Sequence, residues 1–496
     1  MFRKLLLSTA FLYAFVATNA QPVFIDSVEN NNIGRPSRIG DGNEMFTYYI
    51  HGADNTKQKN ASLVLNLTTA GQEPRRVRYD IDKNVNILSA TASNMGAVFL
   101  TYNTATKAST LMLLDFAGNI TQKIPIEGIT QEQAVWDNDI RLFAAMPEGY
   151  VLVLPNAKKN SYVVVAYSSE LKELWKERYE AKGNTVEVAD AKMIGESLFV
   201  LRREQMDAKQ QKYAYHLQVV DLLQHTAKMH ELKDKNDNYC FATAMNEQDG
   251  VVQIAGLCYK DGKFVPGLPA GIAVYEFEMS GMPVRDVFIN GQEVGKFLPD
   301  QIIAAMATNS VLTITAVLNN IGQNVYHLVG EMMEKKETDN KKQEAKINIS
   351  DLMTMVVSKE GELQKLTLAD KAPHMAISLK GSPVTADINT TATWLLKNRL
   401  YNTKAAVQVG DGYYVCTKST DSTKNDIEAV FISMDDPTLN SQFTMSLSRT
   451  PSNDIGMKPT SKYTVVAGTP DMKIKRWQKT DVYNIRGIQF VFFNQV

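Results

Sequence analysis

The chain has 496 residues, of which 44% are hydrophobic and 22% are charged, and its formal net charge is −1. This is the composition of a globular protein that is long enough for several domains or for one large repeat array. The balanced charge gives no support to nucleic-acid binding, which requires a basic face, so no nucleic-acid partner is expected.

The first 20 residues are organised as a secretory signal peptide. Arg3 and Lys4 form a positive start, residues 5–16 are an apolar run too short to span a bilayer comfortably, and small residues precede a cleavage point at Gln21. An uncleaved membrane anchor is the alternative interpretation. No later segment is long and apolar enough for a transmembrane helix. The sequence therefore predicts export to the periplasm, the cell surface or the medium, with no transmembrane segment after cleavage.

The rest of the chain is dominated by a recurring hairpin, in which a polar turn joins two β-rich runs. Its copies lie at residues 61–81, 109–126, 161–179, 215–232, 271–289, 352–368 and 429–447. Another hairpin precedes most of these copies, at residues 86–103, 140–156, 186–204, 239–259, 301–320 and 404–419. Glycine-containing turns between runs of aliphatic and aromatic residues are hairpin signals. The repeating unit is therefore two consecutive hairpins, which make four antiparallel strands.

Four-stranded antiparallel units that repeat around an axis make a β-propeller, and this all-β architecture is the predicted fold. The second strand of each unit is nearly continuous in apolar residues, as at 150–154 and 251–256, which suits a strand packed between two blades. The alternatives are a pair of β-sandwiches, which does not explain the even spacing, and a β-solenoid, which has shorter repeats. We expect an N-terminal arm over 21–43 and one propeller domain over 44–496.

The spacing predicts seven or eight blades, and eight is favoured. Seven copies of the recurring hairpin are visible, and the tail over 454–496 adds three more strand-like runs. This tail either forms an eighth blade or completes the first blade, because propeller rings are usually closed by mixing strands from both ends of the chain.

Two of the three cysteines lie on either side of a predicted hairpin turn. Cys240 and Cys258 are equidistant from Asp249, and a three-residue loop that ends at a left-handed Gly250 would place them directly opposite each other. This arrangement suits a disulfide if the pair is of the non-hydrogen-bonded type, and export supplies an oxidising compartment. Two buried thiols are the alternative. Cys416 has no evident partner and is predicted to be a buried free thiol.

Two segments depart from the repeat. Residues 331–346 form a charged insertion of helical composition and mixed sign, which predicts a solvated helical excursion or a mobile loop. Residues 372–400 form a long connection, for which a short strand and a helical turn are expected.

The sequence contains no motif that specifies a chemistry. His225 and His230 are five residues apart, which does not suit a pair of metal ligands on a helix. Residues 234–239 begin like a calcium loop, but Tyr239 replaces the glycine of the sharp turn and Met245 replaces the glutamate ligand. Phosphate-binding glycine loops and nucleophile elbows are also missing. No metal, no cofactor and no catalytic residue is therefore assigned.

The chain resembles the uncharacterised exported β-propeller proteins of Bacteroidota. The resemblance rests on the signal peptide that ends ATNA before Gln21, on loops rich in Asn and Lys, and on phrases such as LLDFAGNITQKIPI and VVSKEGELQKLTL. It implies a cell-envelope or secreted location and carries no established activity and no catalytic residue.

Two functions agree with these features. The first is a non-catalytic binding or scaffold protein of the bacterial cell envelope, whose ligand is a protein, a peptide or a glycan. The alternative is an enzyme that acts on polysaccharides, with carboxylates from several blades assembled at the mouth of the channel. The binding role is favoured, because the sequence shows no convergent set of catalytic residues.

Overall fold

The protein is described by a computed structural model, in which some segments are left undescribed. The structure describes residues 21–28, 37–39, 44–51, 60–69, 75–136, 140–145, 149–156, 158, 160–209, 212–234, 236–248, 250–320, 322–339, 344–369, 375–380, 388, 391–392, 395, 403–409, 412–418, 426–433, 440–446, 454–459, 463–469 and 486–494. The predicted signal peptide lies outside these residues. Within them, no helix is long and apolar enough to cross a membrane.

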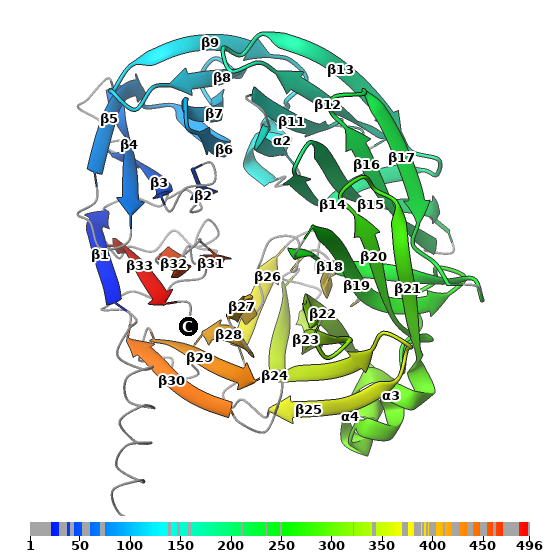
Figure 1. Cartoon of the computed structure of the whole chain (residues 1–496). Helices are drawn as coiled ribbons and strands as arrows, with labels where there is room; N and C mark the ends of the chain where they lie inside the picture. Colours follow the sequence, from blue (N-terminus) through cyan, green and yellow to red (C-terminus); the bar gives the residue numbers. More distant parts are fainter. Residues whose placement is uncertain are drawn as a thin grey trace, which may run out of the picture.

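Eight antiparallel sheets are arranged as blades around a ring, which confirms the β-propeller (Figure 1). Blades 1 to 4 each have four strands in chain order. Their strands are β2 (Ser37–Arg38), β3 (Glu44–His51), β4 (Asn60–Thr69), β5 (Arg75–Asp82), β6 (Val85–Ser93), β7 (Gly96–Asn103), β8 (Ala108–Leu114), β9 (Ile120–Ile126), β10 (Arg141–Ala145), β11 (Gly149–Pro155), β12 (Ser161–Tyr167), β13 (Glu173–Glu180), β14 (Thr185–Ile194), β15 (Ser197–Asp207), β16 (Lys212–Asp221) and β17 (Thr226–Glu231).

Blades 5 to 7 continue the same pattern, and blade 6 has a fifth strand that pairs with β24. Their strands are β18 (Asn238–Gln248), β19 (Val251–Lys260), β20 (Gly271–Glu278), β21 (Pro283–Asn290), β22 (Ser310–Asn320), β23 (Val325–Asp339), β24 (Glu344–Ser358), β25 (Leu363–Ala369), β26 (Met375–Lys380), β27 (Thr403–Val409), β28 (Gly412–Lys418), β29 (Asp426–Ser433) and β30 (Asn440–Ser446). Where the structure describes a whole helix, it is short and joins two blades: α2 (Gln131–Trp136), α3 (Gly291–Phe297) and α4 (Asp300–Met306).

Blade 8 closes the ring with strands from both ends of the chain. Its order is β31 (Asp454–Pro459), β32 (Tyr463–Thr469), β33 (Arg486–Asn494) and then β1 (Gln21–Val28), which pairs with β33. In Figure 1 the blue β1 lies beside the red β33. The tail therefore forms an eighth blade, and the segment expected to be an N-terminal arm supplies that blade's last strand.

The apolar second strands are buried between blades, as their sequences predict. Every residue of β19 except its two ends is buried, and β11 has a single half-buried residue, Leu154. The fourth strands face solvent instead: six of the eight residues of β13 are exposed. This gradient follows from the ring, because the faces of the inner strands pack against neighbouring blades while the outermost strands form the rim.

The charged insertion does not form a helix, and that expectation is wrong for the described part of it. Residues 331–339 belong to β23 and residues 344–346 to β24, which pair with each other and extend the blade. Pairing with β26 gives β24 a second partner along this extension. Tertiary pairing therefore overrides the helical propensity of the sequence. The strand expected within residues 372–400 is β26, and residues 388, 391, 392 and 395 are helical.

The four-stranded pattern gives the ring two distinct faces. The turns that join first to second strands and third to fourth strands gather on one face, which we call the hairpin-turn face. The connections between second and third strands and between successive blades gather on the other, which we call the linker face.

Candidate functional site

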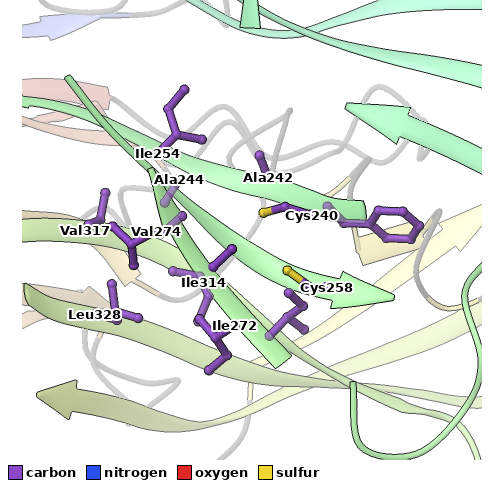
Figure 2. Packing of buried hydrophobic residues seen from close by; sticks show 14 of the residues in the cluster. Cys240, Ala242, Ala244, Ile254, Cys258, Ile272, Val274, Ile314, Val317 and Leu328 are labelled. Atoms are coloured by element: carbon purple, nitrogen blue, oxygen red, sulfur yellow. The ribbon is translucent and has the colours of Figure 1, made fainter. Parts of the chain in front are cut away.

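The two cysteines singled out in the sequence lie directly opposite each other in blade 5. Cys240 on β18 pairs with Cys258 on β19 in the strand register, which confirms the predicted alignment. Both side chains are fully buried, and both thiols are free in this structure. Figure 2 shows the two sulfur atoms among aliphatic side chains of blades 5 and 6. Cys416 lies on β28 opposite Ala405, and its side chain is outside the described part of the chain.

The turn between these strands differs from the one expected. Gln248 pairs with Val251, so the turn has two residues and not three, although Gly250 has the predicted left-handed backbone (φ +77°). A β-bulge between Ala242 and Ala244 shifts the register by one residue. The bulge compensates for the shorter turn, and for this reason the cysteines still meet.

In the segment that begins like a calcium loop, the side chains hydrogen-bond to groups of the same loop. The Asp234 carboxylate accepts hydrogen bonds from the backbone N–H groups of Asn236 and Asn238, both at 2.9 Å, and from the Asn238 amide at 3.0 Å. His225 and His230 contact different aromatic rings, those of Trp175 and Phe277. Among the described residues, no group of three metal-ligating side chains is brought together.

The contact between blades 3 and 4, which we call the 3–4 seam, contains a buried ion pair that the sequence reasoning missed. Arg202 and Glu204 on β15 are 2% and 0% exposed, and the Arg202 guanidinium donates to the Glu204 carboxylate. Arg202 also donates to the Gln218 side chain at 3.0 Å and to the backbone carbonyl of Glu180 at 2.9 Å. The guanidinium thereby ties β15 to the end of blade 3.

The carboxylate of this pair holds the linker that leads into blade 4. Glu204 Oε2 accepts from the backbone N–H groups of Lys182 at 2.9 Å and Gly183 at 3.2 Å. His216 Nδ1 lies 3.8 Å from Glu204 Oε1, and burial lowers the pKa of His216. Tyr162 of blade 3 donates to Gln218, and the Arg202 guanidinium lies 5.6 Å from the centre of the Tyr162 ring. The charged groups of the seam are thus hydrogen-bonded to each other and to the backbone, as buried charges require, while Arg202 Nε and His216 Nδ1 have no hydrogen-bond partner in the part of the chain that the structure describes.

A second buried carboxylate joins blades 5 and 6, at what we call the 5–6 seam. Glu276 on β20 is 3% exposed, and Lys359 from the β24–β25 turn donates to it at 3.3 Å. The Arg285 guanidinium lies 3.9 Å from the same carboxylate and also donates to the backbone carbonyl of Lys359 at 3.4 Å. Burial raises the pKa of Tyr326, and the nearby Glu276 carboxylate raises it further. This network lies toward the hairpin-turn face, whereas the Glu204 network lies toward the linker face.

One signal in the sequence points to the first seam. Strand β15 reads SLFVLRREQMD, so two arginines and a glutamate interrupt a second strand that should be buried on both faces. A charged group in such a strand must find a partner or leave the core. The partners themselves come from three other segments, and for that reason spacing alone does not identify them.

Exposed apolar side chains gather on the hairpin-turn face. We call five of them, on blades 3 to 5, the apolar arc; their exposed fractions lie between 46% and 60%, and they are Leu174, Leu223, Met279, Met282 and Val284. Met95 is exposed on the same face of blade 2. Among the described residues, the other exposed large apolar side chains lie toward the linker face, and they are Met206, Val265 and Phe297.

Contacts between blades join the turns and strands that carry the apolar arc. The Trp175 ring of blade 3 lies 5.3 Å from the His225 ring of blade 4. Lys228 of blade 4 donates to the backbone carbonyl of Ser280 in blade 5 at 3.4 Å. Met279 lies over the turn glycines of blades 4 and 5, because its side chain reaches within 3.9 Å of the place that a Cβ would take at either glycine. The arc therefore lies on three blades that contact one another at this face.

Comparisons with solved structures found two β-propeller domains and a polysaccharide lyase, all at low similarity. The β-propeller domain of the Trilobed protease from Pyrococcus furiosus is 9% identical, with a TM-score of 0.38, and the match covers 86% of this chain and 100% of that one. The β-propeller domain of Nup133 from Vanderwaltozyma polyspora is 8% identical, with a TM-score of 0.40 and coverage of 78% and 91%. The polysaccharide lyase Uly1 is 9% identical, with a TM-score of 0.38 and coverage of 96% and 99%.

Likeness at this level carries no conclusion about ligand or activity. None of the curated proteins matches the chain. A family model matches residues 1–397, which is most of the sequence. The chain belongs to the family described as Family of unknown function (DUF6770).

Proposed function

We propose that this protein is a non-catalytic binding or scaffold propeller, and that the apolar arc on the hairpin-turn face contacts a protein partner. The observation that carries the proposal is the gathering of five exposed Leu, Met and Val side chains across three consecutive blades. Contiguous exposed apolar surface on a folded protein marks an interaction site more often than isolated apolar residues do.

The chemistry of the arc favours a protein over a glycan. Two of its five side chains are methionines, Met279 and Met282, and a third exposed methionine, Met95, lies on the same face. Methionine is flexible and polarizable, and it adapts to apolar partner surfaces of differing shape. Lys228 and the charged strand β13 lie beside the arc and supply the polar rim that protein interfaces have.

Paired variants test the proposed surface. The double variant Leu223→Gln/Met282→Gln removes apolar area from the arc, and Met206→Gln/Val265→Gln removes exposed apolar residues of similar exposure on the linker face. Each affinity-tagged protein is purified from cells of the source organism after reversible cross-linking. We expect a co-purified protein to be lost only with the first variant. Equal recovery with both variants, or equal loss, contradicts the proposal.

We also propose that the protein is exported and works in the cell envelope. The support is the arrangement of the first 20 residues and the resemblance to exported propellers. N-terminal sequencing of the protein from fractionated cells is the test, and we expect a mature chain that begins at Gln21 in the envelope or secreted fraction. An intact N-terminus on protein in the cytoplasmic fraction contradicts export.

A further inference from the structure

The backbone around the two cysteines of blade 5 determines which kind of strand pair they form. The Cys240 N–H donates to the carbonyl of Leu232 at 2.8 Å, on the side of β18 away from β19. The Cys258 carbonyl accepts from the Ala270 N–H at 2.8 Å, on the side of β19 that faces β20. The Cys240 N–H and the Cys258 carbonyl therefore both point away from the opposite cysteine. Because the N–H and carbonyl of one strand residue point to the same side, Cys240 and Cys258 are a non-hydrogen-bonded pair.

This type of pair brings two side chains closest together. Cα atoms in non-hydrogen-bonded antiparallel pairs are about 4.5 Å apart, against about 5.5 Å in hydrogen-bonded pairs. Disulfides join Cα atoms about 4.4–6.8 Å apart, so the strand geometry already meets the requirement without backbone movement. The β-bulge at Ala242 to Ala244 is what aligns the pair, because without it the two-residue turn would offset the cysteines by one position.

We propose that Cys240 and Cys258 form a cross-strand disulfide that links the innermost two strands of blade 5. Each thiol loses its proton, an S–S bond forms, and the two electrons pass to an external disulfide oxidant, such as a thiol–disulfide oxidoreductase or oxidised glutathione. The oxidant's own S–S bond breaks and takes up the two protons as two thiols.

The burial of the pair indicates when the bond forms. Both cysteines are fully buried in the core cluster of blades 4 to 6. Burial raises the pKa of the Cys258 thiol well above its usual value, and the adjacent Cys240 raises it further. Since the thiolate is the reactive species, the closed blade reacts slowly with an oxidant. The bond therefore forms while the β18–β19 hairpin is paired and the blade is still open, and it is then protected from reductants.

Alkylation of the full-length protein tests the pairing directly. The chain, which has three cysteines, is refolded from denaturant in a mixture of oxidised and reduced glutathione. It is then denatured with an alkylating reagent and no reductant, and digested for mass spectrometry. We expect one labelled cysteine, Cys416, and one cross-linked peptide that contains Cys240 and Cys258. Labelling of all three cysteines, or a cross-link that involves Cys416, overturns the proposal.

A stability comparison gives a second, independent readout. We expect oxidised wild-type protein to have a Tm a few degrees above the reduced form, because the bond restricts the unfolded chain. The shift should persist in Cys416→Ala and disappear in both Cys240→Ala and Cys258→Ala. An equal shift in all four proteins contradicts the assignment. If an alanine variant does not fold, the labelling of wild-type protein still decides the question.

Discussion

The 3–4 and 5–6 seams each join neighbouring blades through one buried glutamate, but they bind it differently. Glu204 pairs with an arginine of its own strand and accepts hydrogen bonds from two backbone N–H groups of the linker that leads into blade 4. Glu276 instead pairs with Lys359 of the next blade and with Arg285, which is 38% exposed. The Glu204 carboxylate fixes the linker between blades 3 and 4. The Glu276 carboxylate of blade 5 binds a lysine in a hairpin turn of blade 6.

The difference shows that buried ion pairs join neighbouring blades at both faces of this propeller, whose repeats are only weakly similar in sequence. One network lies toward the linker face and the other toward the hairpin-turn face. In both networks the buried charged groups pair with each other, because an unpaired charge is strongly unfavourable in low-dielectric surroundings. The apolar arc has no such internal partner for its exposed surface, and this contrast is the basis for placing binding there.

The largest loss of folding free energy is expected when Glu204 in the 3–4 seam loses its negative charge. Glu204→Gln leaves the Arg202 guanidinium buried without its carboxylate, which typically costs about 3–5 kcal/mol of folding free energy. Urea denaturation followed by circular dichroism measures the loss. A change below about 1 kcal/mol would show that water reaches the guanidinium and screens its charge.

A smaller effect is expected at the 5–6 seam. Glu276→Gln leaves Lys359 and Arg285, which are 11% and 38% exposed and can recruit water, so we expect a loss of about 1–3 kcal/mol. A double-mutant cycle with Lys359→Met isolates the pair. A loss equal to that of Glu204→Gln would remove the distinction between the two seams.

The 3–4 seam should also respond to pH through His216. Burial lowers the pKa of His216 in the folded protein, so the unfolded chain binds a proton first as the pH falls. The contribution of the neutral His216 side chain to stability is therefore fully present above the unfolded pKa of about 6.5. This contribution is lost as the pH falls through the lower pKa of the folded protein. We expect the Tm to fall less steeply for His216→Gln than for wild type between about pH 7 and pH 5. Parallel curves would count against a buried neutral imidazole.

The smallest effect is expected at an exposed ion pair of the rim. Arg178 and Glu180 on β13 are 3.5 Å apart, with side chains that are 52% and 73% exposed. Glu180→Gln should change the free energy of unfolding by about 0.5 kcal/mol or less, because solvent screens such pairs. The same urea titration serves as the matched control for Glu204→Gln. A larger change would mean that burial is not what separates the seams from the rim.

Most of the fold could be predicted from the sequence, because hairpin turns and apolar strands are local signals. The register of Cys240 and Cys258 was right, although its cause was not a three-residue loop but a bulge combined with a two-residue turn. The error over 331–346 has a different origin. Charged helical composition is a weak preference, and pairing of β23 with β24 and of β24 with β26 outweighs it.

The seams could not be predicted in the same way. The Glu204 network needs Tyr162, Gln218 and the linker at 182–183, which are brought together only when blade 4 packs against blade 3. The apolar arc is likewise spread over three blades, since blades 3 and 4 contribute one residue each and blade 5 contributes three. The charges within β15 indicate that a buried pair exists, but spacing within one repeat identifies neither its partners nor the apolar arc.

Site-specific photo-cross-linking tests the central claim most directly. A photoreactive amino acid is placed at Leu223 or at Met282 on the hairpin-turn face, and at Val265 on the linker face, and each protein is irradiated in living cells. We predict a discrete cross-linked protein from both positions on the hairpin-turn face and no adduct from Val265. Cross-linking at Val265 alone, or no adduct at any position, would contradict the assignment of the apolar arc as the binding surface.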